Sequence, residues 1–281
     1  MFEIAKTKGS HIICKREWTR MKEKIFIFLI ILLLTLSGNN ILTPRAFAQN
    51  TDSPKNVPRT VLVELFVQEG CLTCPTAEFC LEDLAWEYGT TKVILVEEHL
   101  WGDGYDTSET NARYDWYVGD SKKGTPDVFI NGLIKRLQGL ACDCVEGNYE
   151  CYKDAIDTEL TRSSLLELSA SKTIIEDDYI IEGMVKNVSD IPLKDLAVCG
   201  MVGKEGDESG LYNYIQDIFP FQNMPPLLPG ATFNFKFIPE IPLIQEDEAE
   251  GGKDEDKETL HLVIFVQNTE TKEILQALYI E

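Results

Sequence analysis

Up to about residue 162, the chain contains continuous apolar runs of strand length and segments with apolar residues at helical spacing. Residues 61–67 are an almost unbroken apolar run, which predicts a strand covered on both faces, and residues 91–96 predict a second buried strand. Between them, apolar positions at helical spacing over residues 76–88 predict a helix that ends at Gly89. Strand, helix and strand in this order predict a parallel pair joined by a right-handed crossover.

A hairpin and two further helices complete this region. Residues 109–117 predict a short helix, and an apolar strand then ends in Asn131-Gly132. Asn-Gly between apolar runs is the strongest short hairpin signal, so residues 133–137 are the expected return strand. Residues 148–161 have apolar positions on one helical face and predict the last helix.

From about residue 165 the pattern changes to short strands separated by turn residues. The spacing predicts an antiparallel sandwich with strands at residues 166–175, 179–187, 196–202, 231–238, 260–267 and 273–280. The segment Leu228–Phe233 resembles the entry to a middle strand in bacterial immunoglobulin-like domains. Residues 245–258 form an acidic loop that lacks the ligand spacing of a calcium site, and we interpret it as a solvated insertion.

The first 48 residues have the pattern of a secretory signal peptide. A basic start at Met21 leads into the apolar run Ile25–Leu36, and Ala46-Phe47-Ala48 supplies a cleavage site. The apolar run is too short for a membrane anchor, because a bilayer core is about 30 Å thick. Met21 is a more ordinary start than Met1, so residues 1–20 are a candidate for an untranslated segment. We predict a protein exported to the bacterial periplasm or cell exterior, with domains at residues 49–162 and 163–281.

The charge of the chain restricts its partners. The formal net charge is −21 at pH 7, and the leader that export removes is itself basic. Such an acidic protein is a poor ligand for nucleic acid or an anionic membrane surface. We therefore expect no nucleic-acid partner. We also expect that the chain itself is not an integral membrane protein once the leader is cleaved.

Cys71 and Cys74 carry the main candidate chemistry. They form a Cys-x-x-Cys motif between the first strand and the first helix, where amide groups and the helix dipole stabilise a thiolate. Export favours disulfides, and seven of the eight cysteines follow the leader. A permanently closed, structural disulfide is the alternative to a redox-active pair.

The order of elements, with Cys-x-x-Cys after the first strand and Thr125-Pro126 before the hairpin, resembles the thioredoxin superfamily over about residues 57–162. The motif V-E-L-F-x-x-x-x-C-x-x-C-P is similar to that of exported thioredoxin-like proteins. The sequence lacks the Trp before, and the Gly-Pro within, the motif of thioredoxin itself. The resemblance implies a thioredoxin-like α/β domain, followed here by an all-β immunoglobulin-like sandwich.

The resemblance also implies roles for individual residues. Cys71 would attack a disulfide and Cys74 would resolve the mixed disulfide. Thr125 and Pro126 would bind substrate beside the motif, and Glu64 would relay a proton to the resolving cysteine. We therefore predict a thiol–disulfide oxidoreductase that acts on protein thiols and disulfides without a cofactor, with a membrane redox protein as a further candidate partner.

The remaining cysteines leave alternatives open. Cys142 and Cys144 are a candidate second dithiol close enough to exchange disulfides with the first pair. Structural disulfides among Cys80, Cys142, Cys144 and Cys151 are the alternative, with three possible pairings. Cys199 lies in an apolar strand and is predicted to be a buried thiol.

Two other functions compete with redox chemistry. The two cysteine pairs offer four thiolates to Zn²⁺ or Cu⁺, although their wide separation is weakly diagnostic. A non-catalytic binding or scaffold protein is the second alternative. His99 follows the second strand, and we interpret it as an ordinary surface residue.

Overall fold

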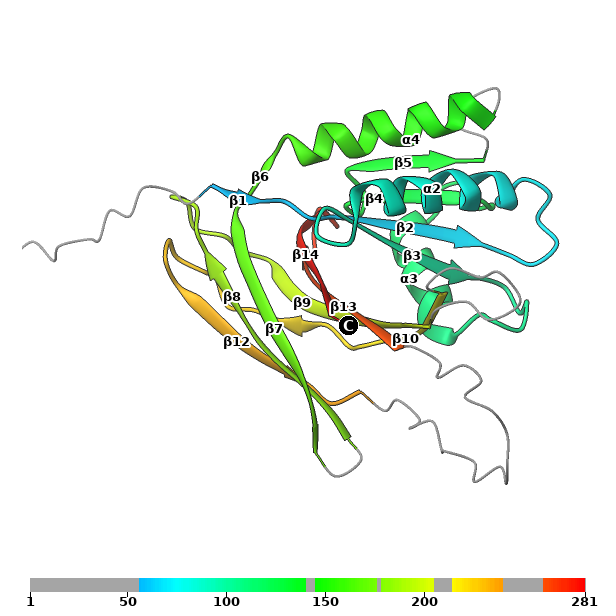
Figure 1. Ribbon diagram of the computed structural model, residues 1–281. Helices are drawn as coiled ribbons and strands as arrows, with labels where there is room; N and C mark the ends of the chain where they lie inside the picture. Colours follow the sequence, from blue (N-terminus) through cyan, green and yellow to red (C-terminus); the bar gives the residue numbers. More distant parts are fainter. Residues whose placement is uncertain (1–55, 140–144, 176–177, 205–213, 240–259, 281) are drawn as a thin grey trace, which may run out of the picture. The chain divides into compact units, whose positions relative to one another are not determined.

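The computed structural model describes residues 56–139, 145–175, 178–204, 214–239 and 260–280 (Figure 1). They all belong to one compact unit that spans residues 52–281. The predicted signal peptide lies outside the described residues and stays a prediction. The predicted domain boundary falls between α4 (Val145–Leu160) and β6 (Ser163–Ser164), and it too stays a prediction.

A nine-stranded mixed sheet forms the centre of the molecule. Along its main path the strands follow the order β14-β13-β9-β10-β3-β2-β4-β5, and β11 pairs with β9. The bounds are β2 Val61–Val67, β3 Val93–His99, β4 Asp127–Ile130, β5 Lys135–Gln138, β9 Leu196–Lys204, β10 Tyr214–Ile218, β11 Gln222–Asn223, β13 Leu260–Asn268 and β14 Ile274–Ile280. β2 and β3 are parallel, as predicted, and β10 joins β3 through the parallel pair Tyr214 and Glu97.

Helices cover both faces of the β2–β3 part of this sheet. Val63 and Leu65 of β2 pack against α2 (Cys74–Tyr88) and α4, in a core that includes Leu84 and Ile156. Phe66 points the other way and packs against Tyr114 of α3 (Ser108–Val118). This arrangement follows from the two-residue period of a strand, which sends neighbouring side chains to opposite faces.

A three-stranded sheet packs against the other end of the central sheet. It has the order β12-β8-β7, with bounds β7 Leu166–Ile175, β8 Asp178–Asn187 and β12 Thr232–Phe237. Val185 and Phe235 from this sheet share a core with Val198 of β9 and Ile264 of β13. The pair β1 (Val57–Pro58) and β6 connects the segment before β2 to the segment after α4.

The two predicted parts of the chain share one apolar core. Cys199 and Met201 of β9, with Val263 and Phe265 of β13, pack against Leu62, Ile94 and Val96 of β2 and β3. These strands are therefore buried on both faces, one against the three-stranded sheet and one against β2 and β3. A free-standing sandwich would expose the second face to water.

The predicted fold, a thioredoxin-like α/β domain followed by an immunoglobulin-like sandwich, is wrong. The described residues are mostly β-sheet with three helices, and β10 continues the sheet of β3 into β9, β13 and β14. Most local elements occur close to where the pattern predicts them, and Asn131 and Gly132 take the positive φ values of a hairpin turn. The prediction failed in the assembly of these elements, because the sequence pattern did not indicate β10 or the shared core.

The shared core predicts that Phe265 stabilises the whole unit. Phe265 is fully buried, and Phe265→Ala should lower the free energy of unfolding by about 3–5 kcal/mol. Phe79→Ala is the matched control, because Phe79 is 59% exposed, and its effect should stay within about 0.5 kcal/mol. Urea denaturation should show one transition for each variant. A separate early transition of residues 163–281 in Phe265→Ala would contradict a shared core.

Candidate functional site

The Cys-x-x-Cys pair forms a disulfide at the start of α2. Cys71 and Cys74 have a Cα–Cα distance of 5.5 Å, and the backbone N–H of Cys74 lies 3.2 Å from the Cys71 sulfur. Gly70 provides the positive φ of the preceding turn, and Pro75 occupies the first helical turn, where its missing N–H is tolerated. Cys74 is buried and Cys71 is partly buried, so the pair is held at the edge of the α2 core.

The other predicted site residues have contacts of their own. The Thr125–Pro126 peptide bond is cis, and the Pro126 carbonyl accepts a hydrogen bond from the Gly139 N–H. Cys142 and Cys144 lie outside the described residues. Cys151 takes part in a disulfide, and Cys199 is a buried thiol, as predicted.

Glu64 does not face the cysteine pair. Residues 63 and 65 point towards α2, and Glu64 points to the opposite face of the sheet, towards α3 and β13. Its carboxylate accepts hydrogen bonds from Arg113 Nε and from the Tyr117 hydroxyl at 2.7 Å. The structure therefore does not place Glu64 where it was expected to relay a proton to Cys74.

Arg113 connects this carboxylate to the second part of the chain. Its guanidinium donates to Gln267 Oε1 at 3.2 Å and lies 4.9 Å from the centre of the Phe265 ring. Gln267 in turn donates to the Tyr117 hydroxyl at 2.7 Å. Glu64, Arg113 and Gln267 are all buried, so this network is a closed polar cluster and not a surface site.

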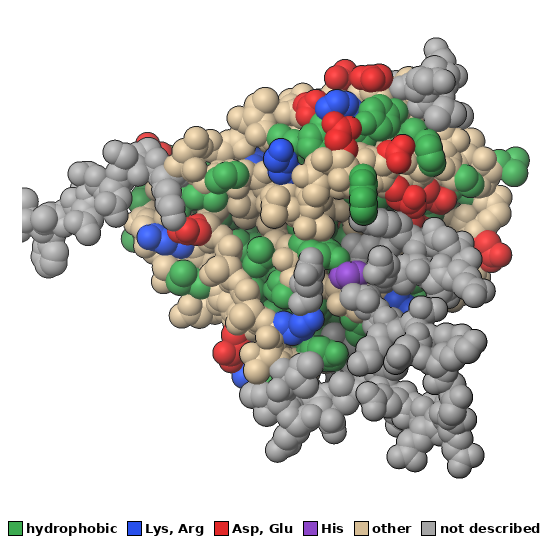
Figure 2. All heavy atoms as spheres, viewed as in Figure 1, with side chains coloured by type: hydrophobic (Ala, Val, Ile, Leu, Met, Phe, Trp, Pro, Cys, Tyr) green, Lys and Arg blue, Asp and Glu red, His purple; other side chains and the backbone are tan. Residues whose placement is uncertain are grey.

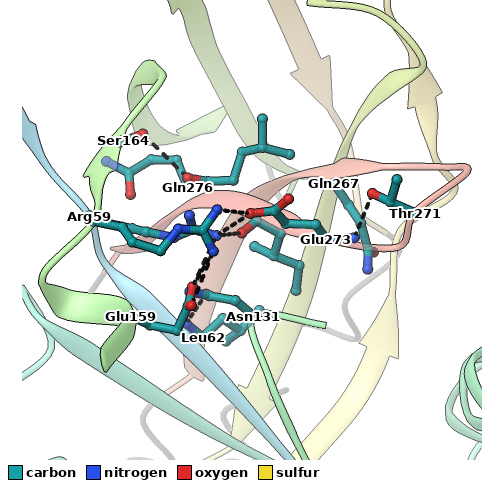
Figure 3. Close-up of polar contacts among 12 residues, drawn as sticks. Arg59, Leu62, Asn131, Glu159, Ser164, Gln267, Thr271, Glu273 and Gln276 are labelled. Carbon is teal, nitrogen blue, oxygen red and sulfur yellow. Dashed lines mark hydrogen bonds and ion pairs between the residues drawn. The ribbon is translucent and has the colours of Figure 1, made fainter. Parts of the chain in front are cut away.

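A second polar cluster joins the segment before β2, α4 and β14 (Figure 3). Arg59 donates to Glu273 at 3.0 Å and forms an ion pair with Glu159 at 3.5 Å. Asn131 donates to Glu159 and accepts the N–H of Leu62, each at 3.0 Å (Figure 3). The cluster fixes the hairpin after β4 against α4 and β14, which gives it a structural role.

Glu98 is a buried carboxyl beside the Glu64 cluster. Neither of its oxygens has a hydrogen-bond partner among the described residues, and its nearest cation is Arg113 at 3.9 Å. Burial raises the pKa of Glu98 well above its ordinary value, and the charge of Glu64 adds to this effect, whereas Arg113 opposes it. One cation therefore faces two carboxyl groups, and burial favours the protonated form of Glu98.

His99 is buried, so its interpretation as a surface residue is wrong. Its Nδ1 lies 2.6 Å from Asp103 and its Nε2 lies 3.1 Å from Glu97, while the ring is 4% exposed overall. The rings of Tyr105 and Tyr214 pack beside it at centroid distances of 5.2 and 6.2 Å. No group of three or more His, Cys, Asp or Glu residues in the described part of the chain has the arrangement of a metal site.

Large exposed apolar side chains lie on α2 and in the turn before it. Leu72 is 97% exposed, Phe79 is 59% exposed and Trp86 is 89% exposed. Phe79 and Trp86 are seven residues apart and lie on one helical face, with Asp83 between them. Over α2 and α4, hydrophobic and acidic side chains lie next to one another (Figure 2).

Comparison with known proteins gives a similarity of fold. No protein family profile matches the sequence, and no curated protein matches it. HBP35 of Porphyromonas gingivalis is similar in structure, with a TM-score of 0.59 and 16% identity over 80% of this chain and 75% of that one. A domain of the outer membrane lipoprotein Omp28 from the same bacterium has a TM-score of 0.28 and 11% identity, over 42% of this chain and 88% of that domain.

These findings overturn the thioredoxin interpretation. The similarity to HBP35 covers both predicted parts of the chain, so it concerns the combined β-rich architecture and not a separate thioredoxin domain. The predicted thiol–disulfide oxidoreductase depended on that resemblance and is corrected with it. The described residues contain no helix long and apolar enough to cross a membrane.

Glu98 makes the stability of the protein depend on pH. Its pKa is higher in the folded than in the unfolded chain, so its stabilising proton is fully present at low pH and is lost as pH rises through the folded pKa. Glu98→Gln imitates the protonated form and should remove this loss of stability with rising pH. The measurement is the free energy of unfolding from urea titrations over a range of pH.

The control is Glu182→Gln, because Glu182 lies on β8 with a largely exposed side chain. This variant should follow the wild-type pH profile. Parallel profiles for wild type and Glu98→Gln would contradict a proton held by Glu98 in the folded protein.

Proposed function

We propose that this protein is exported to the periplasm or cell exterior and binds a basic, apolar segment of a partner protein on the outward face of α2. The observation that carries this proposal is the bare stripe of Leu72, Phe79 and Trp86. Large aromatic side chains of this kind dominate the binding energy of protein interfaces when a partner covers them.

The spacing of the stripe favours a helical or extended apolar partner. Single exposed apolar residues are normal on protein surfaces and need no explanation. Here Phe79 and Trp86 share one face of a helix, and Leu72 precedes it in the turn at the disulfide. A partner that lies along α2 therefore meets Phe79 and Trp86 one after the other.

The charge around the stripe selects a basic partner. α2 contains Glu78, Glu82, Asp83 and Glu87 and has neither Lys nor Arg. Asp83 and Glu87 are exposed, and neither forms an ion pair with a Lys or Arg among the described residues. Acidic groups beside apolar anchors favour Lys and Arg at the rim of the partner segment and repel acidic competitors.

The helix is held rigidly behind this face. Leu81 and Leu84 are buried in the core with α4, and Tyr88 donates a hydrogen bond to Asp157 of α4. Tyr149 of α4 also donates to Glu87 at 2.7 Å. A pre-organised face loses little entropy when it binds, which favours affinity.

The proposal predicts that Trp86 is a binding hot spot. The probe is a synthetic amphipathic helix of Leu and Arg, about 15 residues long so that it is helical. Trp86→Ala should weaken its binding by at least about 30-fold, which corresponds to about 2 kcal/mol. Isothermal titration calorimetry gives the affinity, which should also fall as salt is added.

Two controls separate this face from general attraction to an acidic protein. Leu228→Ala removes an apolar side chain that is 61% exposed elsewhere, and it should leave the affinity unchanged. A peptide with Glu in place of Arg should not bind. Equal binding of the Arg peptide to wild type and Trp86→Ala would sink the proposal.

A further inference from the structure

We propose that the loop between β3 and α3, residues 100–107, is a latch that a proton on His99 holds in place. This inference concerns residues other than the Leu72 stripe and does not depend on the proposed partner. It arises from the hydrogen bonds of Asp103, which organise the whole loop.

Asp103 is the centre of the loop. Its Oδ1 accepts the N–H groups of Tyr105 at 3.0 Å and Asp106 at 3.1 Å. Its Oδ2 accepts the N–H of Glu69 at 3.0 Å and faces His99 Nδ1 at 2.6 Å. The same carboxylate therefore joins the loop, the end of β3 and the turn that precedes Cys71.

The geometry around His99 is satisfied when both ring nitrogens carry a proton and both neighbours are carboxylates. One ring nitrogen faces Asp103 and the other faces Glu97, and a carboxylate only accepts hydrogen bonds. A neutral imidazole has a single N–H, so it satisfies one carboxylate and directs a lone pair at the other. The imidazolium satisfies both, and its charge is compensated on each side.

The surroundings of His99 add further acidic groups from α2. Glu78 of α2 interacts electrostatically with both Glu97 and His99, and Glu82 of α2 interacts with Glu97. Tyr105 of the loop and Tyr214 of β10 pack against the ring and against each other, with 5.7 Å between their centroids. The imidazolium is thus the one positive charge facing this group of carboxyls within the described residues.

The pKa directions agree with this geometry. Burial acts to lower the pKa of His99, but the hydrogen bonds to Glu97 and Asp103 outweigh it, and the net shift is upward. Burial and the charge of Glu97 raise the pKa of Glu78 to about 7. Both groups release their protons as pH rises, so the cluster becomes more negative and the loop loses its central contact.

The sign of the effect follows from linkage. A group with a raised pKa in the closed state stabilises that state below its free pKa, about 6.5 for His, and the stabilisation is lost as pH rises through the closed-state pKa. For Glu78 the corresponding loss begins above about 4.3 and is complete beyond about pH 7. The latch is therefore closed in acid and open in alkali.

The test is amide hydrogen exchange of the purified full chain by NMR, combined with a ¹⁵N titration of the His99 ring. Protection of the Glu69, Tyr105 and Asp106 amides should fall by up to about tenfold for each pH unit between 6.5 and the pKa of His99. Amides of β2 and β3 should keep their protection over the same range. Unchanged loop protection while the ring loses its proton would overturn the latch.

Three variants sharpen the result. Asp103→Asn should remove the protection of these amides at pH 6, and His99→Gln should remove the pH dependence above about pH 7, where Glu78 has already lost its proton. His261→Gln is the matched control, because His261 lies on β13, and it should keep the wild-type transition. Retained loop protection in Asp103→Asn, or a lost transition in His261→Gln, would contradict the assignment.

Discussion

The ion pair between Glu64 and Arg113 is the interaction on which the rest of the structure depends. It lies where β2, α3 and β13 meet, and both groups are buried. Removing one partner of a buried pair leaves an uncompensated charge and costs about 3–5 kcal/mol. Tyr117 and Gln267 complete its hydrogen bonds, so the pair fixes one geometry for the two halves of the chain.

This constraint determines what the molecule presents to a partner. The face of β2 that carries Glu64 is closed by α3 and β13, which leaves α2 and α4 on the opposite face as the exposed helical layer (Figure 1). α2 is packed from behind and exposed in front, where Phe79 and Trp86 are set among carboxylates. A rigid acidic and apolar face of this kind is the basis of the binding that we propose.

The sequence predicted the elements well and their assembly poorly. Periodicity located β2, α2 and the Asn131–Gly132 hairpin because each depends on residues close in the chain. The strands at 196–202 and 260–267 also contain long apolar runs, which is the pattern of strands covered on both faces, yet sandwich-like spacing led us to predict a separate sandwich. β10 is short, and its pairing with β3 has no local signal.

For the site residues, too, local features could be predicted from the sequence and long-range contacts could not. Cys71 and Cys74 form the expected pair, because the strand–turn–helix junction sets their spacing. Alternation along β2 would have placed Glu64 on the face opposite to its neighbours Val63 and Leu65, and this signal was available. The partners of His99 were not predictable, since they require the loop that Asp103 folds back. Phe79 and Trp86, seven apart and off the buried stripe, were a readable sign of an exposed apolar face.

Native-state hydrogen exchange tests the central claim, that both halves of the chain form one cooperative unit. The free energies of opening are measured for amides of β2 and β3 and for amides of β9 and β13. The account predicts one common value near the global free energy of unfolding for all four strands. A lower value confined to β9 and β13, with β2 and β3 still protected, would show two independent domains and contradict it.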